Sequence, residues 1–366
     1  MSTATRSSFP CIAIIGVGLI GGSLGLAIRR AFPRTKVVGV DNPAILRKAR
    51  NAGALTESAK LPEAVRTADL VILAAPSRTI LRQLSRVARF VKPDSMVTDV
   101  GSVKSEIVRQ AEKLFRRGQF IGGHPMAGSE RSGVSAADPL LFENALYVLT
   151  PGRSVSRARL NALARFLKAI GARVVVLRAD VHDRVAAVVS HLPQLTAVAL
   201  MNVAGKRDRV AARHLAMAAG GFRDMTRIAS SPFGMWRDIL QDNRKEVRSA
   251  MRLMVDEMTR YSAAMAVSAA KLRSSFAGAG KVRSRIPANM KGFLHALSGL
   301  QVFLEDKPGS LHRMTGAMAR HGISIKDLEL VKVREGTEGS FRVWFENRET
   351  ALKAKKVLRR AGIRTV

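Results

Sequence analysis

One histidine, His124, stands at the end of a predicted strand between a glycine and a proline. The segment 122–130 reads Gly-Gly-His-Pro-Met-Ala-Gly-Ser-Glu. An imidazole changes its charge near neutral pH, so at a strand end it can accept a hydroxyl proton. A second polar cluster, 99–104, reads Asp-Val-Gly-Ser-Val-Lys and follows another predicted strand. We expect His124 to serve as a base or a hydrogen-bond acceptor.

The helical part of the sequence offers side chains for an anionic substrate. Arg223 and Arg227 follow a break at Gly220 and Gly221, and either arginine could bind a carboxylate through two hydrogen bonds. Spacing alone does not decide between them. His191, taken alone, fits a buried core histidine as well as a binding residue. The other histidines lack a supporting cluster and are expected at the surface: His182, His214, His295, His312 and His321. No cysteine and histidine set has metal-site spacing, so no metal is expected.

The segment 11–25 predicts a dinucleotide-binding turn. An apolar strand pattern runs directly into Gly-x-Gly-x-x-Gly, and a helical pattern follows. Gly16 allows a tight turn, Gly18 lets the backbone approach a pyrophosphate, and Gly21 lets the helix pack on the strand. Free N–H groups at the helix N-terminus then favour the phosphates. The residues expected to contact the cofactor are Gly16, Gly18, Leu19, Ile20, Gly21, Asp41, Pro76 and Ser102.

Asp41 ends the second predicted strand, near the spacing of the acid that binds ribose. A carboxylate here accepts hydrogen bonds from the ribose 2′-hydroxyl and repels a 2′-phosphate. Asn42 and Pro43 follow, so no arginine comes next, although Arg47 and Lys48 lie one helical turn further on. We therefore expect NAD rather than NADP.

Strand and helix patterns alternate over residues 8–178, which predicts an α/β domain with a Rossmann-type doubly wound parallel sheet. Ligands bind such sheets at the carboxyl ends of the strands. Pro76, Ser102 and His124 each follow or end a predicted strand. We therefore expect these three residues around one crevice.

Two further regions follow the predicted sheet. Residues 179–277 have long apolar helical patterns with few turn residues, which predicts an all-helical domain that packs against a second copy in a homodimer. A glycine- and cation-rich stretch, 278–296, is expected to be a linker. Residues 297–366 show the ferredoxin-like order βαββαβ.

The chain of 366 residues has 61 Lys and Arg against 28 Asp and Glu, a formal net charge of +33. The excess of basic residues is spread over all regions, and only 5% of residues are aromatic, so specific nucleic-acid binding is not expected.

No apolar run of about 18 residues predicts a membrane span. No signal-peptide pattern precedes the first strand, and the single cysteine, Cys11, cannot form an intramolecular disulfide. A cytoplasmic protein is expected.

Five motifs, in this order, resemble the prephenate dehydrogenase family, which performs the NAD-dependent step toward tyrosine. They are Gly-x-Gly-x-x-Gly-Gly-Ser (16–23), Asp-x-Gly-Ser-Val-Lys (99–104), His-Pro-Met-Ala-Gly-Ser-Glu (124–130), Ser-His-Leu-Pro (190–193) and Gly-Phe-Arg-Asp-x-Thr-Arg-Ile-Ala (221–229). The last seventy residues resemble an ACT domain. The resemblance covers nearly the whole chain and implies oxidative decarboxylation of prephenate to 4-hydroxyphenylpyruvate.

The resemblance also implies roles for single residues. His124 matches the catalytic histidine that bonds the ring hydroxyl and helps take its proton, and Ser102 matches the serine that orients this histidine and the nicotinamide. Arg227, rather than Arg223, matches the arginine that binds a substrate carboxylate. Other positions that match the substrate pocket are His191, Glu130, Asp224 and Trp236. We expect the ACT-like domain to bind tyrosine as an inhibitory effector, with assembly of the dimer as its alternative role.

Three alternatives stay open at this point. Prephenate and arogenate differ only in a keto or an amino group, and no residue decides between them, although Gln194 stands where some relatives carry histidine. A β-hydroxyacid dehydrogenase or imine reductase would share the order of domains, but it would be expected to use a lysine on the helical domain. An amino-acid-sensing nucleic-acid binder would fit the charge, but no helix-turn-helix or aromatic RNA motif supports it.

Overall fold

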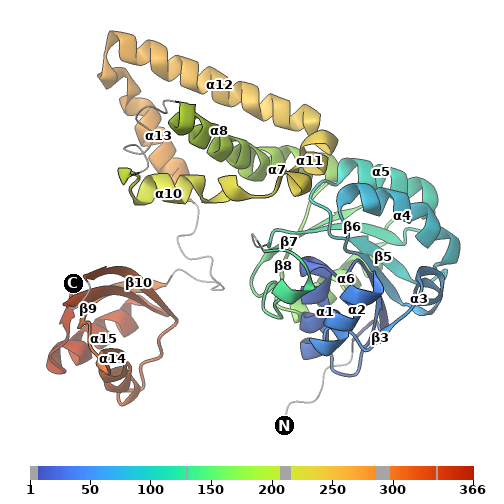
Figure 1. The fold of residues 1–366 in the computed structure, drawn as a ribbon, viewed down its shortest axis with the longest axis horizontal. Coiled ribbons are helices and arrows are strands. Elements are labelled where there is room, and N and C mark those ends of the chain that lie inside the picture. Colours follow the sequence, from blue (N-terminus) through green and yellow to red (C-terminus); the bar gives the residue numbers. More distant parts are fainter. Residues whose placement is uncertain (1–6, 129–130, 207–215, 286–296, 335–336) are drawn as a thin grey trace. The chain divides into compact units, whose positions relative to one another are not determined.

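The computed structural model describes residues 7–128, 131–206, 216–285, 297–334 and 337–366. It divides into two compact units, Met1–Leu272 and Arg273–Val366 (Figure 1). The first unit contains the large sheet and the helical region, and the second contains the C-terminal domain. Each unit has a hydrophobic core of its own.

Eight strands form the sheet of the first unit, in the order β3-β2-β1-β4-β5-β6-β7-β8. The first six follow the strand order of dinucleotide-binding domains, in which the winding reverses beside β1 and leaves a crevice there. The strands are β1 (Cys11–Ile15), β2 (Lys36–Val40), β3 (Glu57–Ser58), β4 (Leu70–Leu73), β5 (Met96–Asp99), β6 (Phe120–Pro125), β7 (Leu146–Pro151) and β8 (Arg173–Val176).

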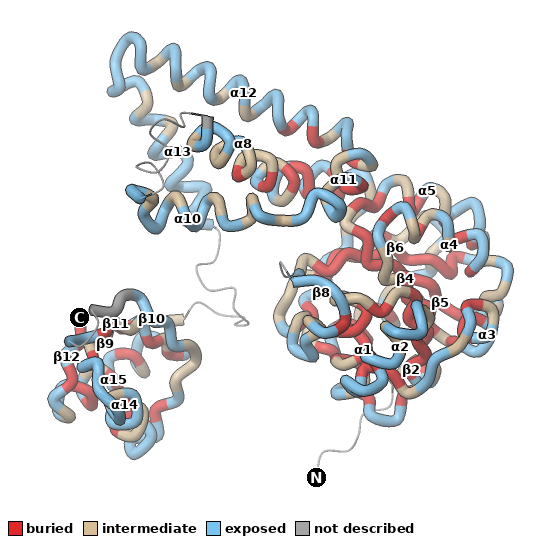
Figure 2. The backbone as a smooth tube through the Cα atoms, in the orientation of Figure 1, coloured by how far each residue is buried: buried red, intermediate tan, exposed pale blue. Residues whose placement is uncertain are grey.

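Helices cover both faces of this sheet, which explains why β1 and β4 are apolar at every position. Ile12 and Ile14 of β1 face one core cluster, and Ala13 and Ile15 face the other. Figure 2 shows the buried strands between exposed helix faces. The helices are α1 (Leu19–Ala31), α2 (Pro43–Asn51), α3 (Leu61–Thr67), α4 (Ser77–Phe90), α5 (Ser105–Leu114) and α6 (Arg157–Ala169).

The sheet differs from the expected parallel sheet at one pair of strands. β7 runs antiparallel to β6, whereas β7 and β8 are parallel to each other. A parallel pair needs a crossover connection, usually a helix. The described part of the chain between β6 and β7 contains only the 3-10 turn η1 (Val134–Ala136), so β7 returns beside β6 in the opposite direction.

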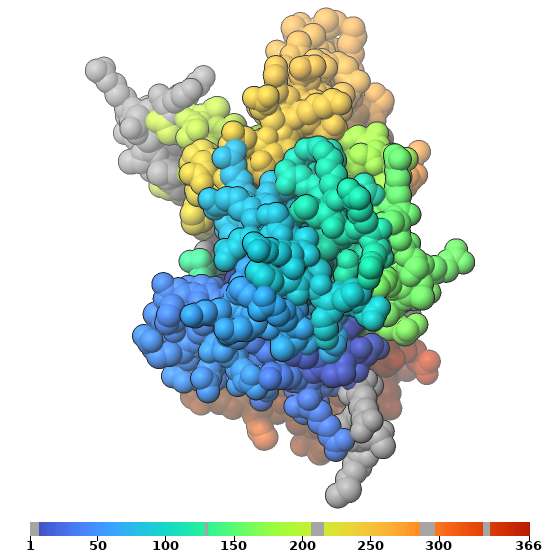
Figure 3. Space-filling model, turned by 90° about the vertical axis from the view of Figure 1, so that its right-hand side faces the viewer, coloured from blue at the N-terminus to red at the C-terminus, as the bar shows by residue number. Residues whose placement is uncertain are grey.

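The helical region of the first unit begins directly after the sheet. Its elements are α7 (Ala179–Ala186), the π-helical turn η2 (Ala187–His191), α8 (Leu192–Lys206), α10 (Gly220–Thr226), the 3-10 turn η3 (Arg227–Ser230), α11 (Phe233–Asp242), α12 (Arg244–Val267) and the 3-10 turn η4 (Ala269–Leu272). Arg78 of α4 lies 3.7 Å from Asp238 of α11, an ion pair that joins the sheet to the helical region. In Figure 3 the cyan atoms of the sheet domain lie against the yellow atoms of the helical region.

One helical stretch, residues 179–205, is long and apolar enough to cross a membrane, contrary to the expectation from sequence. Its first half, however, buries His182 and Asp183 in hydrogen bonds to β6 and to the start of α5. These contacts make the stretch part of the fold of the first unit. The apolar residues on its other side, such as Val188 and Val189, are exposed.

The second unit begins with α13 (Arg273–Arg283), which extends into the stretch 278–296 that was expected to be a linker. Residues 278–283 are therefore helical, and residues 286–296 lie outside the described part of the chain. The predicted order βαββαβ is confirmed, with an antiparallel sheet in the order β10-β11-β9-β12. Its elements are β9 (Ser298–Glu305), α14 (Ser310–Ala319), β10 (Asp327–Arg334), β11 (Glu338–Phe345), α15 (Arg348–Arg360) and β12 (Arg364–Thr365).

Candidate active site

The glycine turn after β1 is dictated partly by packing. Gly16 has a φ of +94°, and a Cβ there would lie 2.5 Å from the carbonyl oxygen of Ala74 at the end of β4. A Cβ at Gly21 would lie 2.0 Å from the carbonyl oxygen of Gly16. Both positions therefore require glycine in the folded protein, whatever the turn binds.

Gly18 is different, because a Cβ at this position would meet no protein atom within 4 Å. It precedes α1, and no side chain caps the first turn of that helix, so its N–H groups face the space beside Gly18. An open glycine at an uncapped helix N-terminus fits the close approach of a pyrophosphate. Leu19 and Ile20, also expected at the cofactor, begin α1.

Asp41 follows β2 and contacts the glycine turn directly. Its Oδ2 accepts a hydrogen bond from the backbone N–H of Val17 at 2.6 Å, and its Oδ1 accepts one from Asn42 at 2.6 Å. Asp41 also lines a cavity of about 770 Å³ together with Pro43 and Gln83. The carboxylate therefore fixes the shape of the turn and lies at the edge of this cavity.

A buried ion pair lies beneath the strand that carries His124. The side chains of Lys104 and Asp99 are fully buried and bonded to each other. Asp99 also accepts the backbone N–H of Gly123 at 3.0 Å, and Lys104 donates to the carbonyl oxygen of Gly123 at 2.8 Å. Both sides of the residue before His124 are therefore fixed by the polar cluster 99–104.

His124 lies near the end of β6 and is 8% exposed. Its Nδ1 lies 2.8 Å from Nε2 of His182, and Nδ1 of His182 lies 2.8 Å from the carboxylate of Asp183. His182 was expected at the surface, but it is 2% exposed. That prediction was wrong because α7 packs against α5 and β7, which places His182 beside His124, 58 positions earlier in the sequence.

The carboxylate of Asp183 is held by the start of α5 as well as by His182. It accepts the backbone N–H groups of Lys104 and Ser105, each at 2.8 Å. Burial raises the pKa of Asp183, but the hydrogen bonds from His182, Ser105 and the backbone outweigh it, so the pKa lies below its ordinary value. Asp183 is therefore ionised at neutral pH.

Two histidines of the site, His124 and His191, stay neutral at pH 7. Burial, followed by the charges of His182, Lys104 and His191, lowers the pKa of His124 well below 6.5. Burial also lowers the pKa of His191 to about 4. A neutral imidazole has one nitrogen free to accept a proton, so His124 can act as a base across the neutral range.

His191 is the last residue of the π-helical turn η2 and is buried. Asn243 donates from Nδ2 to the carbonyl oxygen of Asp183 at 2.8 Å and lies 3.2 Å from Nδ1 of His191. The ring of His191 meets the ring of Trp236 edge-on, with 5.9 Å between centroids. Nδ1 of His191 thus accepts from Asn243, which leaves Nε2–H as a donor. The structure brings His124, His191 and Trp236 into one neighbourhood.

The arginine-bearing turn is attached to the same helix. Gln194, three residues after His191, donates from Nε2 to the carbonyl oxygen of Ile228 at 2.9 Å, and this bond holds η3, which Arg227 begins. Arg223 lies one turn earlier in α10 without such a bond to α8 in the described chain. Asp224 in α10 is exposed, and Glu130 lies outside the described residues.

Ser102 and Pro76 lie at strand ends, as expected. Pro76 caps α4 after β4, and Ser102 is half-buried between β5 and α5. The Ser102 hydroxyl makes no hydrogen bond within the part of the chain that is described, and Nδ1 of His124 is bonded to His182 instead. The sequence did not lead us to predict three residues of this site: His182, Asp183 and Asn243. A His-Asp pair within an apolar helical pattern was the one available signal.

The strand order, the glycine turn and the neutral histidine at the end of β6 define an NAD-binding dehydrogenase in which a helical region follows the nucleotide-binding sheet. Family models match the prephenate dehydrogenase nucleotide-binding domain over residues 24–176, the prephenate dehydrogenase dimerization domain over 178–273, and the ACT domain over 298–362. The prephenate dehydrogenase of Bacillus subtilis (strain 168) is 34% identical over 354 residues, 95% of either chain. The chain belongs to the prephenate dehydrogenase family.

Solved structures agree with this membership. Prephenate dehydrogenase from A. aeolicus, in complex with hydroxyphenyl propionate and NAD+, is 30% identical with a TM-score of 0.66, and the match covers 78% of this chain and 99% of that one. Synechocystis arogenate dehydrogenase is 27% identical with a TM-score of 0.67, over 75% of this chain and 99% of the other.

Proposed function

We propose that the protein catalyses the NAD-dependent oxidative decarboxylation of prephenate to 4-hydroxyphenylpyruvate. The observation that carries the proposal is the neutral, buried His124 at the end of β6, in the same sheet as the glycine turn. NAD, when bound, accepts the hydride from the ring carbon that carries the hydroxyl. The electrons of the bond to the leaving CO₂ then make the ring aromatic.

His124 supports this reaction as a base that returns its proton. Nε2 takes the hydroxyl proton while the carbon–oxygen single bond becomes a carbonyl. After CO₂ has left, the same oxygen carries negative charge and takes the proton back, so prephenate and NAD+ give product, CO₂ and NADH without net proton release. A buried histidine suits this task, because bulk water does not compete for the proton.

Substrate carboxylates require cations and donors near His124. Arg227, held by the Gln194 bond at η3, is proposed to bind a carboxylate, and His191 is proposed to donate a hydrogen bond from Nε2. Trp236 contacts the His191 ring and is proposed to shape the pocket. Ser102, Asp224 and Glu130 are proposed to contribute to the same site.

The direct test is NADH formation, measured at 340 nm, with NAD+ and either prephenate, arogenate or a 3-hydroxyacid. Prephenate is expected to give the highest kcat/KM. A preference for arogenate would assign the alternative substrate, for which the likeness to the Synechocystis arogenate dehydrogenase is the supporting observation. Turnover of 3-hydroxyacids alone would contradict the proposal.

A homodimer is proposed from the helical region, where α12 exposes Leu253, Val255 and Met258 and the stretch before α8 exposes Val188 and Val189. Exposed apolar patches of this kind mark contact surfaces, and the match to a dimerization domain supports it. Sedimentation analysis should give twice the mass of the chain.

We also propose a cytoplasmic location, where NAD-dependent biosynthesis takes place.

The ACT domain is proposed to bind tyrosine and to lower activity. Gly309 precedes α14 with a φ of +85°, and no side chain caps this helix. The turn therefore presents backbone N–H groups that suit an amino-acid carboxylate. For inhibition, tyrosine must bind one conformational state better than the other.

A further inference from the structure

The chain of hydrogen bonds behind His124 determines which ring nitrogen carries a proton. Asp183 is an ionised acceptor, since it receives two backbone N–H groups in addition to the bond from His182. Nδ1 of His182 must therefore be protonated. In a neutral ring the other nitrogen, Nε2, is then an acceptor.

The same argument continues to the next ring. With the His182 ring uncharged, its Nε2 accepts, and the partner at 2.8 Å, Nδ1 of His124, is then the donor. Nε2 of His124 is then unprotonated and free to accept the substrate proton. A histidine side chain in water prefers the opposite tautomer, with the proton on Nε2. In that tautomer Nε2 has no free lone pair and cannot take the substrate proton.

We infer that His182 and Asp183 are positioning residues that hold His124 in the tautomer with a free Nε2 and take up positive charge while His124 stores the substrate proton. The inference rests on the proposed function in one respect, that the proton stored on His124 comes from the substrate hydroxyl. When Nε2 of His124 is protonated, the proton on its Nδ1 can move to Nε2 of His182. The cation then lies beside the carboxylate of Asp183.

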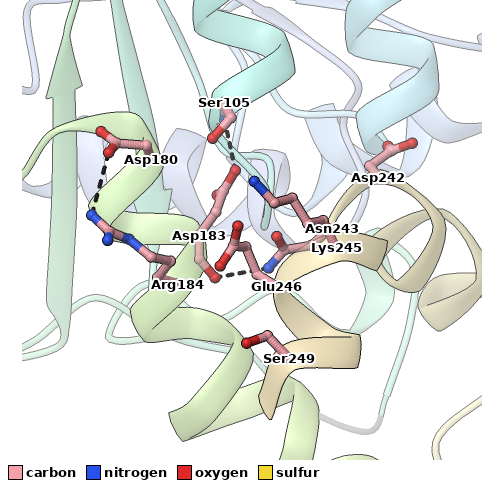
Figure 4. A pocket seen from close by; sticks show the side chains of 9 residues that line it. All are labelled: Ser105, Asp180, Asp183, Arg184, Asp242, Asn243, Lys245, Glu246 and Ser249. Carbon is pink, nitrogen blue, oxygen red and sulfur yellow. Dashed lines mark hydrogen bonds and ion pairs between the residues drawn. The ribbon is translucent and has the colours of Figure 1, made fainter. Parts of the chain in front are cut away.

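The environment of the relay, defined here as His124, His182 and Asp183, supports this charge distribution. Lys104 places a positive charge near His124 and disfavours a cation there. Asp183 borders a polar cavity of about 510 Å³, where Asn243 contacts its backbone carbonyl (Figure 4). Acidic residues outnumber basic ones around this cavity: Asp180, Asp183, Asp242 and Glu246 against Arg184 and Lys245. The Asp183 end of the relay is therefore the better place for a positive charge.

A purely structural role for Asp183 is the competing explanation, because its carboxylate also caps the start of α5. The two roles differ in what they change at His124. A cap stabilises the helix and leaves the tautomer of His124 alone. The relay predicts that the tautomer changes when His182 loses its Nε2.

Nitrogen-15 NMR of the full chain labelled at histidine tests the tautomer without substrate or cofactor. At pH 7.5, His124 is expected to show a protonated Nδ1 and an unprotonated Nε2, assigned with the His124→Gln variant. In His182→Asn, which keeps only the nitrogen that faces Asp183, the proton should move to Nε2 of His124. A protonated Nε2 in the unaltered protein, or an unchanged tautomer in this variant, would overturn the inference.

Steady-state kinetics give the second test. His182→Asn should lower kcat on the order of 10²-fold, with the KM for prephenate within about twofold and the unfolding midpoint close to that of the parent. His182→Gln can present a carbonyl where Nε2 was, and it should recover part of this loss. His321→Gln, at an exposed position beyond the far end of α14, is the control with unchanged kcat.

The two tests separate the inference from the proposed function. The predicted tautomer together with no turnover of prephenate would reject the function and keep the relay. Prephenate turnover with an undiminished kcat in His182→Asn would keep the function and reject the relay.

Discussion

Lys104 and Asp99 form a fully buried ion pair whose members bind opposite sides of the same residue, Gly123. Gly123 directly precedes His124, so the pair fixes the backbone from which the histidine projects. Asp99 has a third contact, the backbone N–H of Gly101 at 2.8 Å. The position of the base therefore depends on two charges that never reach solvent.

Replacing Lys104 by methionine should be strongly destabilising. Asp99 would remain buried without its cation, which typically costs about 3–5 kcal/mol. Urea unfolding measures the change, and Lys113→Met, at an exposed position of the same helix, should stay within about 0.5 kcal/mol. Adding Asp99→Asn to Lys104→Met should recover part of the loss. If Lys104→Met were as stable as the control Lys113→Met, the buried ion pair would contribute nothing to the free energy of unfolding.

His124→Asn should fold normally and lose kcat by about 10²–10⁴-fold, because general-base catalysis is removed. Binding of NAD, followed by fluorescence quenching, should not change. Turnover near that of the parent would remove His124 from the mechanism.

The pH profile of kcat/KM follows from the same residue. The base works only when neutral, and its pKa is lowered well below 6.5 by burial. Activity should therefore stay constant as the pH falls from 8 through 6.5 and decline only at more acidic pH. An acid limb centred at 6.5 or above would show that another group, or an unburied His124, controls the rate. Reaction rates at constant ionic strength provide the measurement.

Arg227→Ala should raise the KM for prephenate by about 10- to 100-fold, since a charge-assisted contact with a carboxylate is lost. Arg223→Ala is the matched control, one helical turn away, and it should change KM little. The affinity for NAD should hold in both variants. A larger effect of Arg223→Ala would reverse the assignment.

Asp41 combines charge with a hydrogen bond to the glycine turn, so two substitutions separate the two effects. Asp41→Asn keeps an acceptor for Val17 and loses the charge, and it should reduce the preference for NAD over NADP by roughly tenfold. Asp41→Ala also loses the bond and should weaken binding of both cofactors. Unchanged discrimination in Asp41→Asn would assign it to Arg47 or Lys48.

Millimolar tyrosine is expected to inhibit the full-length protein through the turn before α14. Gly309→Ala should abolish inhibition, because a Cβ at positive φ distorts the backbone N–H groups of that turn. Gly322→Ala, with a φ of +65° beyond the other end of the helix, introduces the same strain elsewhere and should leave inhibition intact. Indifference of the parent protein to tyrosine would reject the regulatory role.

Local patterns in the sequence were sufficient for much of this protein. The glycine turn, Asp41 after β2 and His124 at the end of β6 were all predicted, because each depends on a strand or helix and the few residues beside it. The ferredoxin-like order of the last domain was predicted for the same reason. These features are encoded by residues that lie next to each other in the chain.

The partners of His124 were decided only by the tertiary structure. His182 lies 58 positions away, and Lys104 bears a charge that is normally found at the surface. Whether such residues are buried depends on which segments pack together, and hydrophobic periodicity does not specify that. The antiparallel return of β7 was likewise decided by a connection without a crossover helix. The sequence thus determined where the base stands, whereas packing between α7, α5 and β6 decided what surrounds it.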